Sequence, residues 1–548
     1  MNTSEYIAYY LTQCGVDKAF VISGSGAVYL DDAFYHHSEL ECVAARSDFG
    51  AVMMACATAR LTGKIGAALV TKGPASIHAM TGVSEAWADS VPLVVVSGQV
   101  DRDQIQSNTR TIGAQGFDIV PMVSHITKYA VTVSNPNEIK YHLEKAVHLA
   151  TTGRPGPVWL DIPIDIQNSE VDIASLIEYQ CANDESLHAT NISSQVAALL
   201  EQATRPVLIL GNGVRHADSV PYFYQLVERL NIPVVVTRLA LDLFDHSDPR
   251  FIGYAGDIGH KAGNEALKNA DLVLSLGSSL APTLTGTGEQ YSFKNAKVVS
   301  VNIEHESVYR NDLSIDYVFD IDLRDFLPSL LAHLSRASIG QYKDWLTKCQ
   351  SMKEQLHFSV SQDDSKPIDM YYFMSKLNPF LNDRHVIIND TGGTYTIAGQ
   401  VIQYVPGQRE ICTSTFASMG AALSLGAGSA IADRDKQIIV LVGDGSVESN
   451  IQELAVIAKH NTNTKIFIFN NGRYASIRHF QNQLCDGRIT DSDDSMNFSK
   501  IAGAFSLNYY AISSADEIED IAAQVLTDND PMVIEVFCEP NQHFVLAR

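Results

Sequence analysis

Short apolar runs alternate with longer helical segments along most of this chain. In the clearest example, an apolar, β-branched run at 438–442 is followed by Gly-Asp-Gly, a helical segment to about residue 460 and a second apolar run at 465–469. Apolar runs of this length are typical of strands that are buried on both faces of a parallel sheet. We therefore expect a strand–helix–strand unit whose two strands are parallel neighbours.

The same alternation along the whole chain predicts an α/β fold with three doubly wound parallel-sheet domains. At 548 residues the chain is too long for one hydrophobic core, and polar stretches at about 168–190 and 336–365 divide it. The expected domains are 1–167, 190–335 and 366–548. The remaining expected strands are 18–22, 40–44, 67–71, 93–97, 158–163, 206–210, 233–237, 272–276, 297–303, 386–389 and 532–537.

Composition and charge disfavour several classes of partner. The net charge of −24 argues against nucleic acid and against anionic membranes. The eight cysteines include no Cys-x-x-Cys pair, which makes a metal-binding or disulfide framework a poor interpretation. Because no signal-like N-terminus and no apolar run of membrane-spanning length is apparent, we expect a cytoplasmic protein.

Polar residues follow both strands of the 438–472 unit. Asp444 follows the first strand, in a tight turn with Gly443 and Gly445, and Asn471 follows the second. The carboxyl ends of neighbouring parallel strands meet at one edge of the sheet, so these two oxygen ligands could hold Mg²⁺. Ser446 is expected to cap the helix between the strands, whose N-terminus favours an anion.

The Gly-Asp-Gly and Asn-Asn sequences of the 438–472 unit resemble the signature of thiamine-diphosphate (ThDP) enzymes, in which Gly-Asp-Gly is followed by Asn-Asn. Here Asp444 and Asn471 lie 27 positions apart. The phrases ARLTGKIGAALVTKGPAS, GRPGPVWLDIPID and STFASMGAALSLGAG extend the resemblance over essentially the full length, to the acetolactate synthase-like branch (acetohydroxyacid synthase and pyruvate decarboxylase). The stretches QGFDIVPMVSHITKYA and GRYASIR…PNQHF are most similar to members from bacterial surface-polysaccharide clusters.

The resemblance implies a pyrimidine-binding, a central Rossmann-like and a diphosphate-binding domain, in that order. It also implies that Asp444, Asn471 and the main-chain carbonyl of Arg473 hold the metal. Met419, 25 residues before Asp444, takes the place of the apolar residue that bends the cofactor into a V, and Gln115 that of a glutamine near the bound intermediate. The other cofactor contacts implied are Gly24, Gly392, Gly393, Thr394, Ser418, Gly443, Gly445 and Ser446.

The residue that should activate the cofactor departs from the family pattern. The family has a glutamate there, and counting back twelve positions from Arg60 leads to Asp48. An aspartate is one methylene shorter, about 1.5 Å of reach, and a misplacement of about 1 Å can cost roughly a hundredfold in rate. Three alternatives stay open: the backbone approaches and the enzyme is active; Asp48 acts through water in a slower or altered enzyme; or the protein binds ThDP without turnover. Only a shifted alignment would give this role to Glu39 or Glu41.

Other departures concern the pocket and a second cofactor. Ala114 replaces the phenylalanine usual before Gln115, which would open the acceptor side, and Ser449 replaces a methionine. The Arg-Phe-Asp-Asp phrase that binds flavin in acetolactate synthases is absent after Gly277, so FAD is in doubt.

The resemblance implies a ThDP- and Mg²⁺-dependent transferase or lyase, a carboligase that decarboxylates a 2-oxo acid such as pyruvate. The acyl unit would pass to a carbonyl acceptor, for which a keto-sugar would suit the opened pocket. The alternatives are a ThDP-dependent C–C lyase or hydrolase, and a non-catalytic ThDP-binding homologue. A nicotinamide-dependent dehydrogenase is disfavoured because no expected strand ends in Gly-x-Gly-x-x-Gly. The family's site lies between the first domain of one chain and the third of another, which implies a homodimer or homotetramer.

Overall fold

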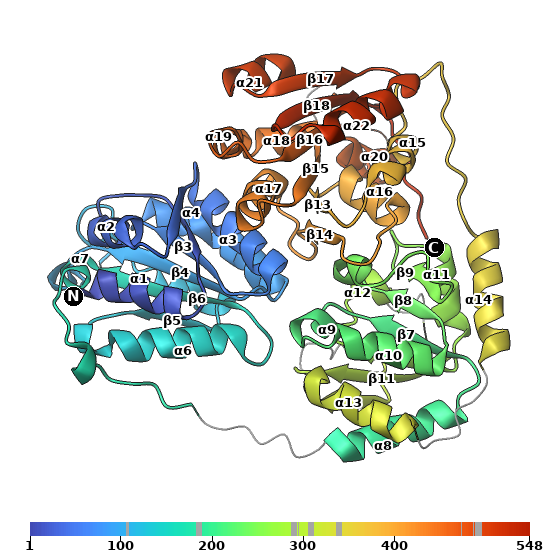
Figure 1. The fold of residues 1–548 in the computed structure, drawn as a ribbon, viewed down its shortest axis with the longest axis horizontal. Coiled ribbons are helices and arrows are strands. Elements are labelled where there is room, and N and C mark those ends of the chain that lie inside the picture. The colour runs from blue at the N-terminus through green and yellow to red at the C-terminus, as the bar shows by residue number, and fades with distance from the viewer. Residues whose placement is uncertain are drawn as a thin grey trace.

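The chain forms three separate six-stranded sheets, and all of their strand pairs are parallel (Figure 1). The computed structural model describes residues 1–105, 109–181, 189–286, 293, 295–304, 312–335, 342–472, 474–485, 487 and 496–547. Helices cover the sheets, so the fold is α/β with three doubly wound domains, as predicted.

The first sheet has the strand order β2-β1-β3-β4-β6-β5 and forms the blue domain in Figure 1. Its strands are β1 Lys18–Val21, β2 Glu41–Ala44, β3 Gly66–Val70, β4 Leu93–Gln99, β5 Tyr129–Thr132 and β6 Pro157–Pro163. Its helices are α1 Thr3–Gln13, α2 Val28–His36, α3 Asp48–Thr62, α4 Pro74–Ala88, α5 Val120–Val123, α6 Ile139–Thr151 and α7 Ile164–Gln167.

The third sheet repeats this topology, with the order β14-β13-β15-β16-β18-β17. Its strands are β13 His385–Asn389, β14 Arg409–Cys412, β15 Gln437–Gly443, β16 Thr464–Asn470, β17 Asn508–Ile512 and β18 Met532–Phe537. Its helices are α15 Met370–Leu377, α16 Gly393–Val401, α17 Ala421–Ala432, α18 Asp444–Glu448, α19 Leu454–Lys459, α20 Ala475–Leu484, α21 Phe498–Ala504 and α22 Ile518–Thr527. The first and third domains are therefore two versions of one fold.

The central sheet has the order β12-β11-β10-β7-β8-β9, which is the order of dinucleotide-binding sheets. Its strands are β7 Pro206–Leu210, β8 Val234–Val236, β9 Phe251–Tyr254, β10 Leu272–Leu276, β11 Lys297–Asn302 and β12 Tyr317–Asp320. Its helices are α8 Ala189–Gln202, α9 Gly213–His216, α10 Val220–Leu230, α11 Lys261–Asn269, α12 Pro282–Thr285 and α13 Leu323–Leu334. Helix α14 (Lys343–Gln355) buries Trp345, Leu346 and Cys349 against this domain.

The first and third domains contact each other through helices of equal topological position. Helix α3 follows β2, α17 follows β14, and the two helices pack closely. Small residues permit this approach: a Cβ added at Gly428 would lie 2.5 Å from the Met54 carbonyl oxygen. Near the far end of this contact, Asp89 accepts hydrogen bonds from Arg60 and from the Ser414 backbone.

The helix expected between Ser446 and residue 460 is interrupted. It begins at Asp444 with Gly443 as its N-cap, stops at Glu448, and resumes as α19 after a 3₁₀ turn. The prediction that Ser446 caps this helix is therefore wrong, because Ser446 lies inside the first turn. Its hydroxyl hydrogen-bonds the carboxylate of Asp390 instead.

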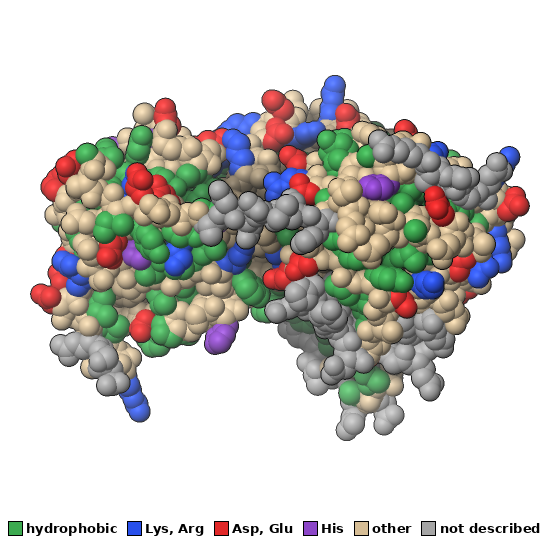
Figure 2. All heavy atoms as spheres, turned by 90° about the horizontal axis from the view of Figure 1, so that it is seen from below, with side chains coloured by type: hydrophobic (Ala, Val, Ile, Leu, Met, Phe, Trp, Pro, Cys, Tyr) green, Lys and Arg blue, Asp and Glu red, His purple; other side chains and the backbone are tan. Residues whose placement is uncertain are grey.

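Acidic, basic and apolar side chains are mixed on the face of the molecule shown in Figure 2. None of the helices in the described part of the chain is long and apolar enough to cross a membrane.

Candidate active site

Asp444 lies at the carboxyl end of β15, next to the end of β16. Gly443 is in register with Phe469, so the ends of the two strands are neighbours, as the sequence predicted. Asp444 is only 5% exposed, and its Oδ2 accepts a hydrogen bond of 2.9 Å from the Gly472 backbone. Burial raises the pKa of Asp444 to about 6. A cation bound here would favour the charged carboxylate and offset the cost of burying it.

The two asparagines after β16 differ in what they contact. Asn470 is buried and donates to Glu535 Oε1 at 2.6 Å, while its own Oδ1 accepts from the Gly472 backbone. Asn471 is half-buried beside it, and Arg473 lies outside the described residues. In the described part of the chain, no three His, Cys, Asp or Glu side chains are grouped so that they could hold a metal ion. A metal at this edge would therefore need amide and carbonyl oxygens besides Asp444.

The loop after β13 leaves space for a ligand. Gly392 has a φ of +89° and is the N-cap of α16; the nearest atom to a Cβ added there is Ser476 Oγ, at 3.7 Å. Nothing lies within 4 Å of a Cβ added at Gly443. Thr394 is buried and donates its hydroxyl to the Asp390 carbonyl, so only its backbone N–H could serve a ligand.

Asp390 joins three parts of the site, and the sequence analysis missed it. It is fully buried and accepts hydrogen bonds from the backbones of Thr391, Gly420 and Ala422 and from the Ser446 hydroxyl. Burial raises its pKa to about 6. The available signal was its place at the end of a buried strand, in the phrase Asp-Thr-Gly-Gly.

Met419 presents an apolar side chain at a polar edge. It is 39% exposed, which argues against its being an ordinary core methionine. The residue before it, Ser418, donates its backbone N–H to Glu85 Oε1 at 2.7 Å. The residue after it, Gly420, has a φ of +79°, and a Cβ added there would lie 2.9 Å from the Ser446 carbonyl oxygen. Met419 is thus held between a contact to the first domain and the Gly-Asp-Gly turn.

Asp48 lies close to this segment through a shared neighbour. The Ser47 hydroxyl is 3.4 Å from Asn450 Oδ1, and Asn450 Nδ2 donates to the Gly420 carbonyl at 3.3 Å. Ser47 and Gly420, the chain neighbours of Asp48 and Met419, therefore contact one buried amide, that of Asn450. These contacts form within a single chain, whereas the family resemblance places the two halves of the site on different chains. The arrangement across a dimer stays a prediction.

The Asp48 carboxylate has two oxygens in different surroundings. Its side chain is 13% exposed, and burial raises its pKa. Oδ2 lies 3.3 Å from His78 Nδ1, whereas Oδ1 is buried and has no hydrogen-bond partner among the described residues. The alternative residue Glu41 begins β2, at the opposite end of that strand, and pairs with Arg434.

Gln115 and Gly24 lie in loops of the first domain. Gln115 is exposed with a φ of +60°, and its carbonyl oxygen would lie 1.9 Å from a Cβ added at Gly73. The Gly24 backbone donates to Asp31, and a Cβ there would meet Thr71 at 2.5 Å. Contacts within the first domain therefore account for the backbone positions of Gln115 and Gly24, without a bound ligand. Gly393 begins α16, and a Cβ added at Gly445 would meet Tyr474.

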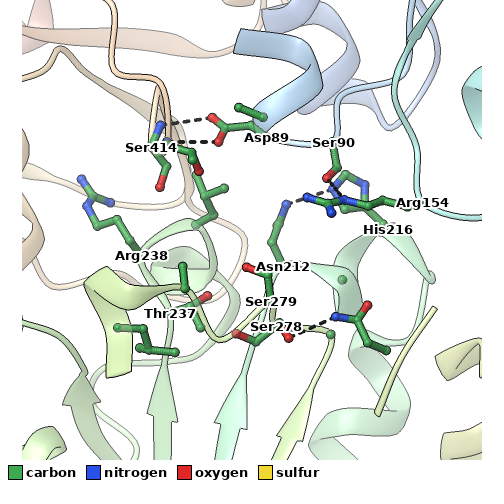
Figure 3. A pocket seen from close by; sticks show the side chains of 18 of the residues that line it. Asp89, Ser90, Arg154, Asn212, His216, Thr237, Arg238, Ser278, Ser279 and Ser414 are labelled. Carbon is green, nitrogen blue, oxygen red and sulfur yellow. Dashed lines mark hydrogen bonds between the residues drawn. The ribbon is translucent and has the colours of Figure 1, made fainter. Parts of the chain in front are cut away.

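A separate cavity of about 520 Å³ lies where the three domains meet (Figure 3). Residues of all three domains line it, among them Arg154, Ser278 and Ser414. It opens at the ends of β7 and β10, where the Gly211 and Gly277 turns touch: a Cβ added at Gly211 would lie 2.2 Å from the Gly277 carbonyl oxygen. Its size and position suit a small-molecule site.

Three basic side chains that could face a nucleotide, Lys128 of the first domain and Arg215 and His260 of the central domain, contact other groups of the protein. Lys128 donates to two backbone carbonyls, Arg215 pairs with the buried Asp242, and His260 contacts the Gln400 carbonyl. In the turn after Gly277, where the flavin-binding phrase of acetolactate synthases is absent, Ser278 Oγ accepts a hydrogen bond from the Leu280 backbone. The turn thus satisfies part of its own hydrogen bonding.

Comparison with known sequences agrees with this architecture. Three family profiles match: "Thiamine pyrophosphate enzyme, N-terminal TPP binding domain" at 1–122, "Thiamine pyrophosphate enzyme, central domain" at 193–330, and "Thiamine pyrophosphate enzyme, C-terminal TPP binding domain" at 390–536. Together they account for most of the chain.

Similar proteins span nearly the same length. The acetolactate synthase large subunit of Lactococcus lactis is 28% identical, over 98% of this chain and 93% of that protein. The acetolactate synthase isozyme 2 large subunit of Escherichia coli strain K12 is 27% identical, over 98% and 95%. The probable acetolactate synthase large subunit of Methanocaldococcus jannaschii is 27% identical, over 98% and 92%.

Proposed function

We propose that this chain, which belongs to the ThDP-dependent enzymes and is related to the acetolactate synthases, decarboxylates a 2-oxo acid and transfers the acyl unit to a carbonyl acceptor. Pyruvate is the proposed donor. The observation that carries this proposal is the buried, unpartnered Oδ1 of Asp48 in the first domain together with the exposed Met419 in the third, whose chain neighbours Ser47 and Gly420 both contact Asn450.

The residues at this edge fit ThDP and a divalent cation. For Mg²⁺ we propose Asp444, Asn471 and the Arg473 carbonyl, because Asp444 is a buried carboxylate that a cation would stabilise. For the diphosphate we propose the backbone at Gly392 and Gly393, because the nearest atom to a Cβ added at Gly392 is 3.7 Å away, although one added at Gly393 would contact Phe544. The other proposed cofactor contacts are Gly24, Thr394, Ser418, Gly443, Gly445 and Ser446.

Bound ThDP supplies a thiazolium that accepts the electrons released when a 2-oxo acid loses CO₂. The protein's part is to hold and activate it. Asp48 Oδ1 would share a proton with a ring nitrogen of the pyrimidine, and the buried setting strengthens that interaction. Met419 would support the bent cofactor, and Asp444 would carry the charge that the cation balances.

We also propose an acceptor larger than pyruvate. Ala114 replaces a phenylalanine, and Ser449 is a small side chain against Gly420, 3.1 Å from a Cβ added there. Both choices reduce the side-chain volume expected around the pocket. Gln115 would contact the acceptor. A keto-sugar, in line with a role in surface-polysaccharide synthesis, is the proposed acceptor class.

We propose that the chain works without flavin. The Arg-Phe-Asp-Asp phrase is absent, and the Ser278 turn hydrogen-bonds to itself. The absorbance spectrum of the denatured, purified protein should show no stoichiometric flavin. One flavin per chain would overturn this point and leave the ThDP proposal intact.

Product analysis tests the reaction. The purified protein, given ThDP, Mg²⁺ and pyruvate, should release CO₂, and the acyl unit should appear in a ligation product when a keto-sugar is added. Asp444→Asn should lose ThDP binding and CO₂ release together. Release of acetaldehyde alone, with every acceptor refused, would favour a lyase. ThDP binding without any CO₂ release from a panel of 2-oxo acids would favour the non-catalytic alternative.

A further inference from the structure

The main chain next to Asp48 is held by contacts with the third domain. The Ser47 hydroxyl caps α3 by accepting from the Gly50 backbone at 3.0 Å, and it donates to the buried Glu453 at 2.8 Å. A Cβ added at Gly50 would lie 2.3 Å from Glu453 Oε1. The backbone at the start of α3 is thus packed directly against the third domain.

What remains adjustable is the orientation of the carboxylate itself. A single contact bears on it among the described residues: Oδ2 lies 3.3 Å from His78 Nδ1. Oδ1 is buried and unpartnered. A buried acceptor without a donor costs free energy, so a ligand that donates a hydrogen bond would be favoured at this oxygen.

The helix that carries His78, α4, is held by contacts near both of its ends. At its start, a Cβ added at Gly73 would lie 1.9 Å from the Gln115 carbonyl oxygen. Seven residues after His78, on the same face, the buried Glu85 accepts from Ser418, next to Met419. Helix α4 therefore carries both His78 and a residue, Glu85, that hydrogen-bonds the chain next to Met419. The ring is 57% exposed, so water reaches its other side.

We propose that His78 is a positioning residue, which holds Asp48 Oδ2 so that Oδ1 is the oxygen offered to the pyrimidine of ThDP. This inference rests on the proposed function. Aspartate is one methylene shorter than glutamate, so the contact with His78 would help to orient its carboxylate. A glutamate reaches further and would depend less on this contact. His78 touches the carboxylate only, and it is not assigned a proton-transfer step.

The test uses the full-length protein loaded with ThDP and Mg²⁺, and it measures the rate at which bound ThDP exchanges its C2 proton with solvent. His78→Leu removes the contact and should slow exchange by about tenfold to a hundredfold, the range expected for a misplaced group. His78→Asn keeps an N–H donor near the position of Nδ1 and should restore most of the rate. In an Asp48→Glu background, His78→Leu should have little effect.

Two controls separate positioning from general damage. His36→Leu removes a comparable but exposed contact, His36 to Asp32 at 3.1 Å, and should leave exchange unchanged. ThDP affinity and the melting temperature should stay nearly constant across all the variants. Equal exchange in wild type and His78→Leu would overturn the inference, as would equal losses in His78→Leu and His78→Asn. Because C2 exchange needs no substrate, a failure with pyruvate would count against the proposed function and not against His78.

Discussion

At the scale of single residues, the site depends on buried carboxylates that differ in what surrounds them. Asp444 accepts a hydrogen bond from one backbone N–H group, Asp48 has one oxygen without a partner among the described residues, and Asp390 accepts hydrogen bonds from three backbone N–H groups. Motif spacing pointed to Asp444, and a count from Arg60 pointed to Asp48. Asp390 and His78 were not identified as neighbours of these residues because their contacts join distant segments, which no local pattern encodes.

Asp390 predicts a pH dependence of stability. Its pKa is raised from 3.8 to about 6 in the folded protein, so the native state binds the proton more tightly than the unfolded chain. Protonation of Asp390 therefore adds its full stabilisation below about pH 4, and this is lost as the pH rises to about 6. By linkage, the free energy of unfolding falls by roughly 3 kcal/mol over this range.

The variant Asp390→Ala checks this assignment. It should lower the melting temperature at both pH 4.5 and pH 7, because buried N–H groups lose their acceptor at a cost of about 1–3 kcal/mol each. It should also show a smaller fall in stability between the two pH values than wild type does. Asp32→Ala, which changes an exposed carboxylate, should match wild type. An unchanged pH profile in Asp390→Ala would contradict the assignment.

At the scale of elements, the buried strands were predictable and the edge strands were not. Five of the six edge strands were missed: β5, β9, β12, β14 and β17. Their apolar runs are short or begin with polar residues, and in β5, β12 and β17 most positions are only partly buried. β5 is half-buried throughout, and β14 begins with Arg409 and Glu410, which bond to Asp242. Their strand character comes from pairing with a neighbour already in place.

The close packing of α3 on α17 predicts opposite effects for two glycine substitutions. Gly428→Ala should destabilise the protein by about 1–3 kcal/mol, because the new Cβ would lie 2.5 Å from the Met54 carbonyl oxygen. Gly503→Ala, in α21, meets nothing within 4 Å and should be neutral or stabilising by up to about 1 kcal/mol. Melting temperatures check both. Equal changes in melting temperature for the two variants would contradict the close contact between α3 and α17.

At the scale of the whole molecule, the first and third domains share one strand order and contact each other through α3 and α17. The sequence showed no repeat between these domains, because a shared strand order needs only a similar hydrophobic pattern and not similar residues. The chain also exposes large apolar side chains on the first domain, including Val28, Tyr29, Ile77, Trp87 and Met122. Such side chains are common at interfaces between subunits.

We therefore predict a homodimer or homotetramer in solution. Light scattering coupled to size-exclusion chromatography should give a mass of two or four chains at micromolar concentration. Replacing Ile77 and Trp87 by serine should shift the mass toward that of one chain. A wild-type protein that is monomeric across the concentrations tested and still active would contradict the assembly, and would leave a site complete within one chain.

The central claim is that Asp48 activates bound ThDP. Its most direct test is the C2-proton exchange rate of the cofactor, measured by NMR in the presence of Mg²⁺ for wild type, Asp48→Ala and Asp48→Glu. The account predicts fast exchange in the wild type, a loss of about a hundredfold or more in Asp48→Ala, and fast exchange in Asp48→Glu. Slow exchange in the wild type that is rescued by glutamate would contradict it, and would mean that this scaffold binds ThDP without activating it.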